Sequence, residues 1–156
     1  MMSRLVGLIV LAALAVAPAA QTARSTVHLS GGGTASVGGA PFSQVAMNVA
    51  FGTSGSASGN FNCLMAGRSK GVLGGFGLKH IMKVHATPTK GSVSGTIATF
   101  SGPGFLIMDN GQHANIEVSV WVNVATQQFQ LTVLKFTPSP IALPTETFSS
   151  GGVKLG

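Results

Sequence analysis

Five cationic side chains follow one another in the middle of the chain with no carboxylate between them. They are Arg68, Lys70, Lys79, Lys83 and Lys90, and His85 lies in the same stretch. Alternate residues of a strand point to the same side, so we expect Lys79, Lys83 and His85 on one face. We predict that these six residues bind polyanions, such as anionic envelope polymers or acidic glycans. The alternative interpretation is an edge strand whose lysines prevent aggregation between strands.

The segment 67–71, GRSKG, has the G-x-S-x-G form of a serine-hydrolase nucleophile, with Ser69 as the nucleophile. That motif requires a strand before the serine and a helix after it. The segment GGFG follows soon after instead, and glycines disfavour a helix. We therefore predict no catalytic residue, and an extracytoplasmic hydrolase that uses Ser69 is the alternative. Its candidate partners are Asp109, Glu146 and His113.

Imidazole is the commonest side-chain ligand of transition metals, and the chain has four histidines. They are His28, His80, His85 and His113. His80 and His85 are five residues apart, which places them on opposite faces of a strand. No carboxylate or second cysteine lies near them in the sequence. We predict no metal site and no cofactor, and a metal-dependent enzyme that uses the histidines belongs to the alternative above.

Carboxylates are scarce, since Asp109, Glu117 and Glu146 face nine lysines and arginines and give a formal net charge of +6. Paired carboxylates, cages for hard cations and Asp-supported triads all require acidic residues. Most hydrolase mechanisms are therefore disfavoured.

The single cysteine, Cys63, cannot form an internal disulfide. It lies in an alternating apolar stretch, so we interpret it as a small buried side chain and not as a reactive thiol.

Residues 1–19 have the form of a secretory signal peptide. Arg4 precedes an apolar run over 5–17, and Pro18 and small residues follow it. The run is shorter than the roughly 20 residues of a membrane-spanning helix. We therefore expect cleavage, with a retained membrane anchor as the alternative. We predict one domain, 20–156, that is secreted or periplasmic and spans no membrane after cleavage.

Strand-like alternation covers most of the remaining sequence. It is clearest over 115–125, where Ile116 and every second residue as far as Val124 are apolar. Such alternation predicts a strand with one face on a core. The same pattern places Val45, Met47, Val49 and Phe51 on a second buried face, Phe129, Leu131 and Val133 on a third, and Val93, Ile97 and Thr99 on a fourth.

Turn residues separate these runs. Asp109, Asn110 and Gly111 predict a tight hairpin, because Asn and Gly tolerate a positive φ. We expect loops at 68–77, which is rich in glycine, and at 137–150, whose three prolines exclude a central strand. The strands between these turns number about eight to ten.

The fold that we predict is all-β, a single antiparallel β-sandwich of jelly-roll or immunoglobulin-like type, with a small barrel as the alternative. An outer-membrane barrel also has alternating strands, but it carries aromatic girdles at both membrane interfaces. This chain has no Tyr, and its one Trp, Trp121, lies on the polar side of its strand. We therefore disfavour the outer-membrane barrel.

Four stretches of strand and turn sequence occur in a fixed order. They are SGNFNCLMAG, MKVHATPTKGSVSGTIATFSGPG, FQLTVL and LPTETFSSGGVKL, with an alternating strand at 116–122 between the second and the third. Together they resemble a group of uncharacterised secreted bacterial domains similar to the post-COAP type. The resemblance covers 31–155, and this chain departs from it by a longer glycine-rich, basic insertion at 68–77. It implies a small extracytoplasmic β-sandwich, often an accessory domain, and transfers no site residue.

The export signal, the basic run and the scarcity of acids together predict a non-catalytic secreted protein. We expect an envelope-associated binding or structural module with a basic face for anionic polymers or glycans. We expect no specific nucleic acid partner, because aromatic residues do not alternate with the cations. The sequence leaves the oligomeric state open.

Overall fold

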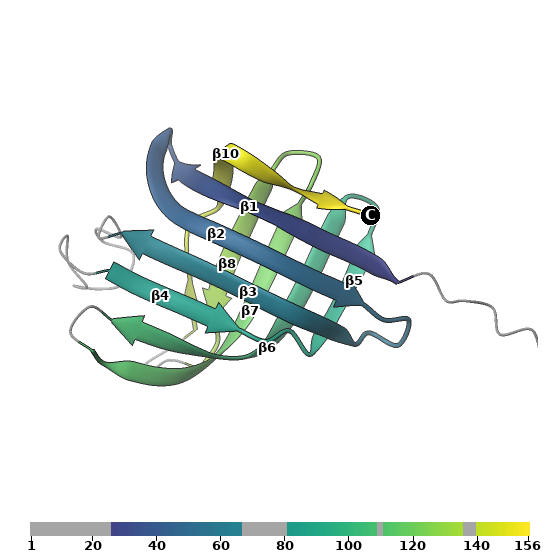
Figure 1. The fold of residues 1–156 in the computed structure, drawn as a ribbon, viewed down its shortest axis with the longest axis horizontal. Coiled ribbons are helices and arrows are strands. Elements are labelled where there is room, and N and C mark those ends of the chain that lie inside the picture. The colour runs from purple at the N-terminus through teal and green to yellow at the C-terminus, as the bar shows by residue number, and fades with distance from the viewer. Residues whose placement is uncertain (1–25, 67–80, 109–110, 136–139) are drawn as a thin grey trace, which may run out of the picture.

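The computed structural model describes residues 26–66, 81–108, 111–135 and 140–156, which form ten β-strands and no helix (Figure 1). The strands are β1 (Val27–Val37), β2 (Ala40–Phe51), β3 (Ala57–Ala66), β4 (Ile81–Ala86), β5 (Lys90–Ser94), β6 (Ile97–Met108), β7 (His113–Asn123), β8 (Gln128–Val133), β9 (Ile141–Ala142) and β10 (Glu146–Leu155). The predicted all-β class is confirmed. The predicted signal segment 1–19 and the glycine-rich segment 68–77 lie outside the described residues.

The strands form one antiparallel sheet that closes on itself. The order of neighbours is β10-β1-β2-β3-β4-β6-β7-β8, and β10 also pairs with β8. The result is a closed barrel of eight strands. The two short strands are additions to it, because β5 pairs with β6 and β9 pairs with β8. The chain therefore runs up and down around the barrel.

The predicted β-sandwich is wrong, and the small barrel given as its alternative is the observed fold. In Figure 1, β1–β4 and β10 cross the front of the molecule, with the end of β6 beside β4, whereas β5, β8 and the other parts of β6 and β7 lie behind at a steep angle. A sandwich would leave two sheets with separate edges. Here β6 pairs with strands of both layers, and the β10–β8 pairing joins the layers on the other side. That second junction consists of Glu146 opposite Phe129 and Thr147 opposite Gln128.

Strand β6 turns the corner between the layers at two glycines. Its first part, as far as Ser101, pairs with β5, and its last part, from Gly104, pairs with β4. A Cβ at Gly102 would collide with the carbonyl oxygen of Thr87, and a Cβ at Gly104 would collide with that of His85. The missing side chains therefore let the neighbouring backbone approach β6 closely where it bends.

Apolar side chains fill the barrel. Phe61, Phe100 and Phe129 are fully buried, and the rings of Phe61 and Phe100 meet edge to face with centroids 5.8 Å apart. Burial of an aromatic side chain of this size contributes roughly 2–3 kcal/mol. The outward positions of the strands carry mostly polar residues. Outer-membrane barrels have the reverse arrangement, because their apolar side chains face outward to the lipid.

Three of the four predicted apolar faces are confirmed, since their residues on β2, β7 and β8 are buried in the core. The fourth is wrong. Ile97 is 37% exposed and Thr99 lies on the outer side of β6, whereas Ala98 is fully buried. The reason is the turn between β5 and β6, where Gly95 has a φ of +58°. The chain reverses there and pairs Val93 with Ala98, so these two residues share the inner face.

The hairpin predicted at 109–111 connects β6 to β7. Its described part includes Gly111, whose amide donates a hydrogen bond of 2.9 Å to the Met108 carbonyl oxygen. The loop predicted at 137–150 is wrong at both its middle and its end, because Ile141 begins β9 and Glu146 begins β10. The prolines of this segment all precede β10, so they do not interrupt its pairing.

Candidate functional site

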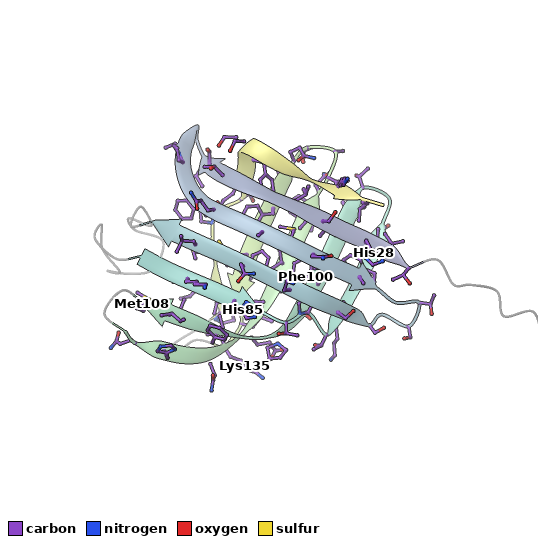
Figure 2. All side chains as sticks on the ribbon, viewed as in Figure 1. His28, His85, Phe100, Met108 and Lys135 are labelled. Carbon is purple, nitrogen blue, oxygen red and sulfur yellow. The ribbon has the colours of Figure 1, made fainter. Side chains whose placement is uncertain are left out.

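The six predicted binding residues fall into three groups. Lys83 and His85 lie on β4, and Lys90 begins β5. Arg68, Lys70 and Lys79 lie outside the described residues. Lys83 is exposed and His85 is half-buried, and both lie on the outer side of β4, between the buried residues of that strand. Figure 2 shows His85 on the lower part of the front layer.

Lys90 lies on another part of the surface than Lys83. Lys83 stands opposite Ile107 on β6, whereas Lys90 stands opposite Ser101, six residues earlier on that strand. At about 3.3 Å per residue, these positions are separated by roughly 20 Å of strand. The bend at Gly102 lies between them. The two lysines therefore do not belong to a single basic face.

Strand register arranges the surface around Lys83 and His85 into two rows, which we call the β4 face. The first row contains Thr34, Gln44, Leu64, Lys83, Ile107 and His113, and the second contains Gly32, Ala46, Asn62, His85, Phe105 and Asn115. Neighbours in one row lie about 5 Å apart. Cationic, amide and apolar side chains are therefore close together, and none of the twelve residues is acidic.

Two neighbours in the second row hold His85 in place. Its Nδ1 lies 2.9 Å from Asn62 Oδ1, and its ring centroid lies 5.0 Å from that of Phe105. An amide oxygen accepts hydrogen bonds and does not donate them, so the proton of this bond belongs to Nδ1. The other ring nitrogen, Nε2, is then the one that can contact a ligand.

A shallow hollow of about 400 Å³ lies on the β4 face beside Lys83. Its lining includes Ala46, an outward position of β2 that carries only a methyl group. Other lining residues supply hydroxyl, amide, apolar and ammonium groups. They include Thr34, Gln44, Asn62, Leu64 and Lys83. This combination suits a ligand that carries both negative charge and hydrogen-bonding groups.

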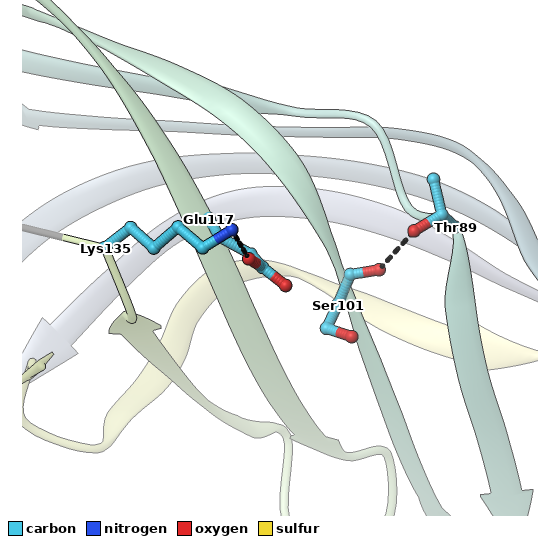
Figure 3. A network of polar contacts seen from close by, with 4 residues as sticks. All are labelled: Thr89, Ser101, Glu117 and Lys135. Atoms are coloured by element: carbon cyan, nitrogen blue, oxygen red, sulfur yellow. Dashed lines mark hydrogen bonds and ion pairs between the residues drawn. The ribbon is translucent and has the colours of Figure 1, made fainter.

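Glu117 lies half-buried on the outer side of β7, and its carboxylate forms an ion pair with a lysine. Lys135 Nζ lies 2.6 Å from Glu117 Oε2 (Figure 3). The hydrogen bond and the charge of Lys135 hold the pKa of the Glu117 carboxyl below its ordinary value, and Lys90 adds a weaker attraction. The Glu117 carboxylate lies outside the two rows of the β4 face. No acidic side chain within these rows therefore offsets the charge of Lys83.

The described residues do not assemble the hydrolase site that the sequence left as an alternative. Ser69 and Asp109 lie outside them. His113 is exposed at the start of β7, whereas Glu146 is buried inside the barrel. The wall of the barrel therefore separates the two remaining partners of the proposed triad.

Sequence reasoning missed a polar pair inside the barrel. Glu146, at the start of β10, has no exposed surface, and Ser43 on β2 is buried. The Ser43 hydroxyl donates a hydrogen bond to Glu146 Oε2, and Oε1 has no hydrogen-bond partner among the described residues. Burial raises the pKa of Glu146 to about 7. A strand over this segment would have placed Glu146 on the same side as the apolar Phe148, two residues later. That alternation is the sequence signal for the inward position of Glu146.

Cys63 lies close enough to this pair to interact with it. Burial, followed by the charge of Glu146, raises the pKa of the Cys63 thiol, and a hydrogen bond with Ser43 opposes the shift. The thiol is therefore protonated and shielded from solvent, which makes it a poor nucleophile. The interpretation of Cys63 as a buried side chain is confirmed.

Within the ranges that the structure describes, no group of three or more His, Cys, Asp and Glu side chains is placed to hold a metal ion. These ranges also contain no helix with the length and apolar character needed to cross a membrane.

Comparisons with protein families, curated proteins and solved structures found no match to this chain. Functional inference therefore rests on the surface geometry described above.

Proposed function

We propose that this protein is an exported, non-catalytic module that binds anionic polymers on its β4 face. The observation that carries the proposal is the hollow beside Lys83, because its lining residues supply one ammonium, several hydroxyl and amide groups and no carboxylate. His85 stands next to this hollow, opposite Asn62. A polymer crossing β1 to β4 would meet these groups in succession.

The chemistry of the face favours phosphate or carboxylate groups. The ammonium of Lys83 offers three hydrogen-bond donors and a positive charge, and the amides of Gln44 and Asn62 offer uncharged donors. Leu64, which is 36% exposed, and Phe105, which is 37% exposed, stand beside Lys83 and His85 and lower the local dielectric constant. Contacts between exposed charges are weak individually and are screened by salt. We therefore expect modest, salt-sensitive affinity that increases with polymer length.

The exported location in this proposal rests on the form of residues 1–19. The resemblance to secreted post-COAP-type domains is consistent with an accessory module at the cell envelope. A single buried cysteine also suits an oxidising compartment, since it leaves no exposed thiol to cross-link among the described residues.

Retention on immobilised polyglycerol phosphate tests the proposal. This probe carries regularly spaced phosphates and no sugar ring, so it isolates the contribution of charge. The protein should be retained at low ionic strength and should elute before about 0.3 M NaCl, where the Debye length falls to roughly 6 Å. The Lys83→Glu variant should elute at clearly lower salt.

Lys154→Glu is the matched control, because it makes the same change in net charge at an exposed position of β10, opposite Ser30 and outside the two rows. If both variants elute at the same salt concentration, retention depends on net charge and the β4 face is not the site. Absence of retention of the unmodified protein at low salt would also contradict the proposal.

A further inference from the structure

A second depression, of about 300 Å³, lies on the opposite layer of the barrel. Its lining side chains are unusually rich in hydroxyl groups, which come from Ser92, Thr99, Ser101 and Ser119, and Lys90 adds an ammonium group. The depression therefore differs from the hollow on the β4 face, where amides and an apolar side chain contribute. Its chemistry is mainly that of uncharged hydrogen bonds.

Register extends this depression into two rows across β5, β6, β7 and β8, which we call the hydroxyl face. One row contains Lys90, Ser101, Ser119 and Thr132, and the other contains Ser92, Thr99, Trp121 and Gln130. All eight residues lie on the outer side of their strands and are exposed or half-buried. Trp121 is not a lining residue of the depression, but it stands directly opposite Thr99, which is one.

The hydroxyls of this face keep much of their hydrogen-bonding capacity. Ser92 and Thr99 share one bond, with their oxygens 3.0 Å apart. Each hydroxyl offers one donor and two acceptor positions, so this pair still has one donor for a ligand. At Ser101, the contact with the Thr89 hydroxyl involves the main-chain carbonyl oxygen and leaves the side chain unused (Figure 3).

Trp121 supplies the apolar component of the face. It is the one Trp of the chain, and its half-buried position on a polar row exposes part of an aromatic surface to solvent. The face of an aromatic ring carries negative charge density, which attracts weakly positive C–H groups. A ligand with C–H bonds on one side and hydroxyls around its edge would use both Trp121 and the serines.

The neighbouring charges do not demand an anionic ligand. Glu117 lies two residues before Ser119 on β7, and its charge is offset by Lys135 at 2.6 Å. Lys90, which lines the depression, adds a weaker attraction to the same carboxylate. The ammonium of Lys90 can therefore donate hydrogen bonds to hydroxyl or ring oxygens of an uncharged ligand.

We infer that the hydroxyl face is a binding site for pyranose saccharides. The sugar ring would pack against Trp121, and its hydroxyls would exchange hydrogen bonds with Ser101, Ser119 and Thr99. This site goes beyond the proposed function, because it lies on the other layer of the barrel and depends on stacking and uncharged hydrogen bonds. Its affinity should therefore resist salt, unlike that of the β4 face.

Intrinsic fluorescence provides a direct test, since all indole emission of the protein comes from Trp121. We would titrate the full protein with a β-1,4-glucan hexasaccharide, a chitin hexasaccharide and an oligouronate of similar length, in about 0.5 M NaCl to suppress charge-driven binding. At least one of the three should shift the emission saturably at millimolar or lower concentration. The preferred probe would identify whether the site takes neutral, N-acetylated or acidic sugars.

Calorimetry with the preferred oligosaccharide then assigns the site. Trp121→Ala and Ser119→Val should each weaken binding by about tenfold or more. Trp121→Phe should retain part of the affinity, because it keeps an aromatic ring. Lys83→Glu is the matched control on the β4 face and should leave saccharide binding unchanged.

The outcomes distinguish the two sites. If none of the three oligosaccharides shifts the emission, or if folded Trp121→Ala and Ser119→Val proteins bind with unchanged affinity, the saccharide site is refuted and the polymer proposal is untouched. If saccharide binding disappears in Lys83→Glu, the sugar lies on the β4 face and the assignment to the hydroxyl face is wrong.

Discussion

Replacing Glu146 with Gln should stabilise the barrel at neutral and alkaline pH and leave its stability nearly unchanged in acid. The buried carboxyl accepts a hydrogen bond from Ser43, and its Oε1 has no partner among the described residues. A neutral carboxyl tolerates this environment far better than an ionised one. Glutamine has nearly the same shape, keeps an oxygen for the Ser43 hydroxyl and carries no charge.

The magnitude follows from the linkage between protonation and folding. Burial raises the pKa of Glu146 from 4.5 to about 7. The folded protein thus holds this proton more tightly than the unfolded chain does. The stability that results is fully present below pH 4.5 and is lost as the pH rises to about 7. At about 1.4 kcal/mol per pH unit, this interval corresponds to at most about 3 kcal/mol.

Urea unfolding at pH 5 and pH 8 measures the effect in wild type and in Glu146→Gln. Between these pH values the wild type should lose about 2–3 kcal/mol more than the variant, which is about 10 °C in melting temperature. Other titrating groups are common to both proteins, so the difference isolates Glu146. Glu117→Gln, the same substitution at an exposed carboxyl, should not alter the pH dependence over this interval. Equal losses in wild type and Glu146→Gln would refute the reasoning.

Two further predictions concern the bend of β6 and the buried thiol. Gly102→Ala should lower the free energy of unfolding by about 2 kcal/mol or more, because the added methyl group would collide with the Thr87 carbonyl oxygen. Gly156→Ala is the control and should be neutral in the same denaturation assay, because no atom lies near that position. The Cys63 thiol should react with a disulfide reagent only as fast as the protein opens, because it is buried and protonated at neutral pH. Immediate reaction of the native protein would contradict its burial.

The strands of this barrel could be predicted because alternation is a local property. The apolar residues of β2, β7 and β8 each repeat with period two, and each set is buried. Alternation fails where a turn is hidden, as at Gly95, which reverses the chain between Val93 and Ala98. Barrel closure could not be predicted, since it depends on contacts between β10 and β8 at Glu146 and Thr147. Alternation within one strand carries no signal of which other strand it pairs with.

For the candidate sites too, the sequence predicts which side of a strand a residue occupies but not which strands lie side by side. The outward position of Lys83 and His85 follows from strand alternation. The predicted grouping of Lys83 with Lys90 is wrong, because these lysines pair with different parts of β6. The hollow beside Lys83 is lined by Thr34, Gln44 and Ala46, which lie on other strands. The hydroxyl face likewise combines residues of four strands. Only the register of the folded sheet brings such residues together.

The position of Glu146 affects how binding by the outer faces should be measured. This carboxyl is buried at the junction of β10 and β8, whereas Lys83 of the β4 face lies on the outer surface. A change of pH from 5 to 8 therefore acts on the stability of the closed barrel as well as on surface charge. A loss of polymer retention at alkaline pH has two possible origins in the wild type. In the Glu146→Gln protein the contribution from this carboxyl is removed, so a loss that persists there must come from groups outside the barrel interior or from the polymer itself.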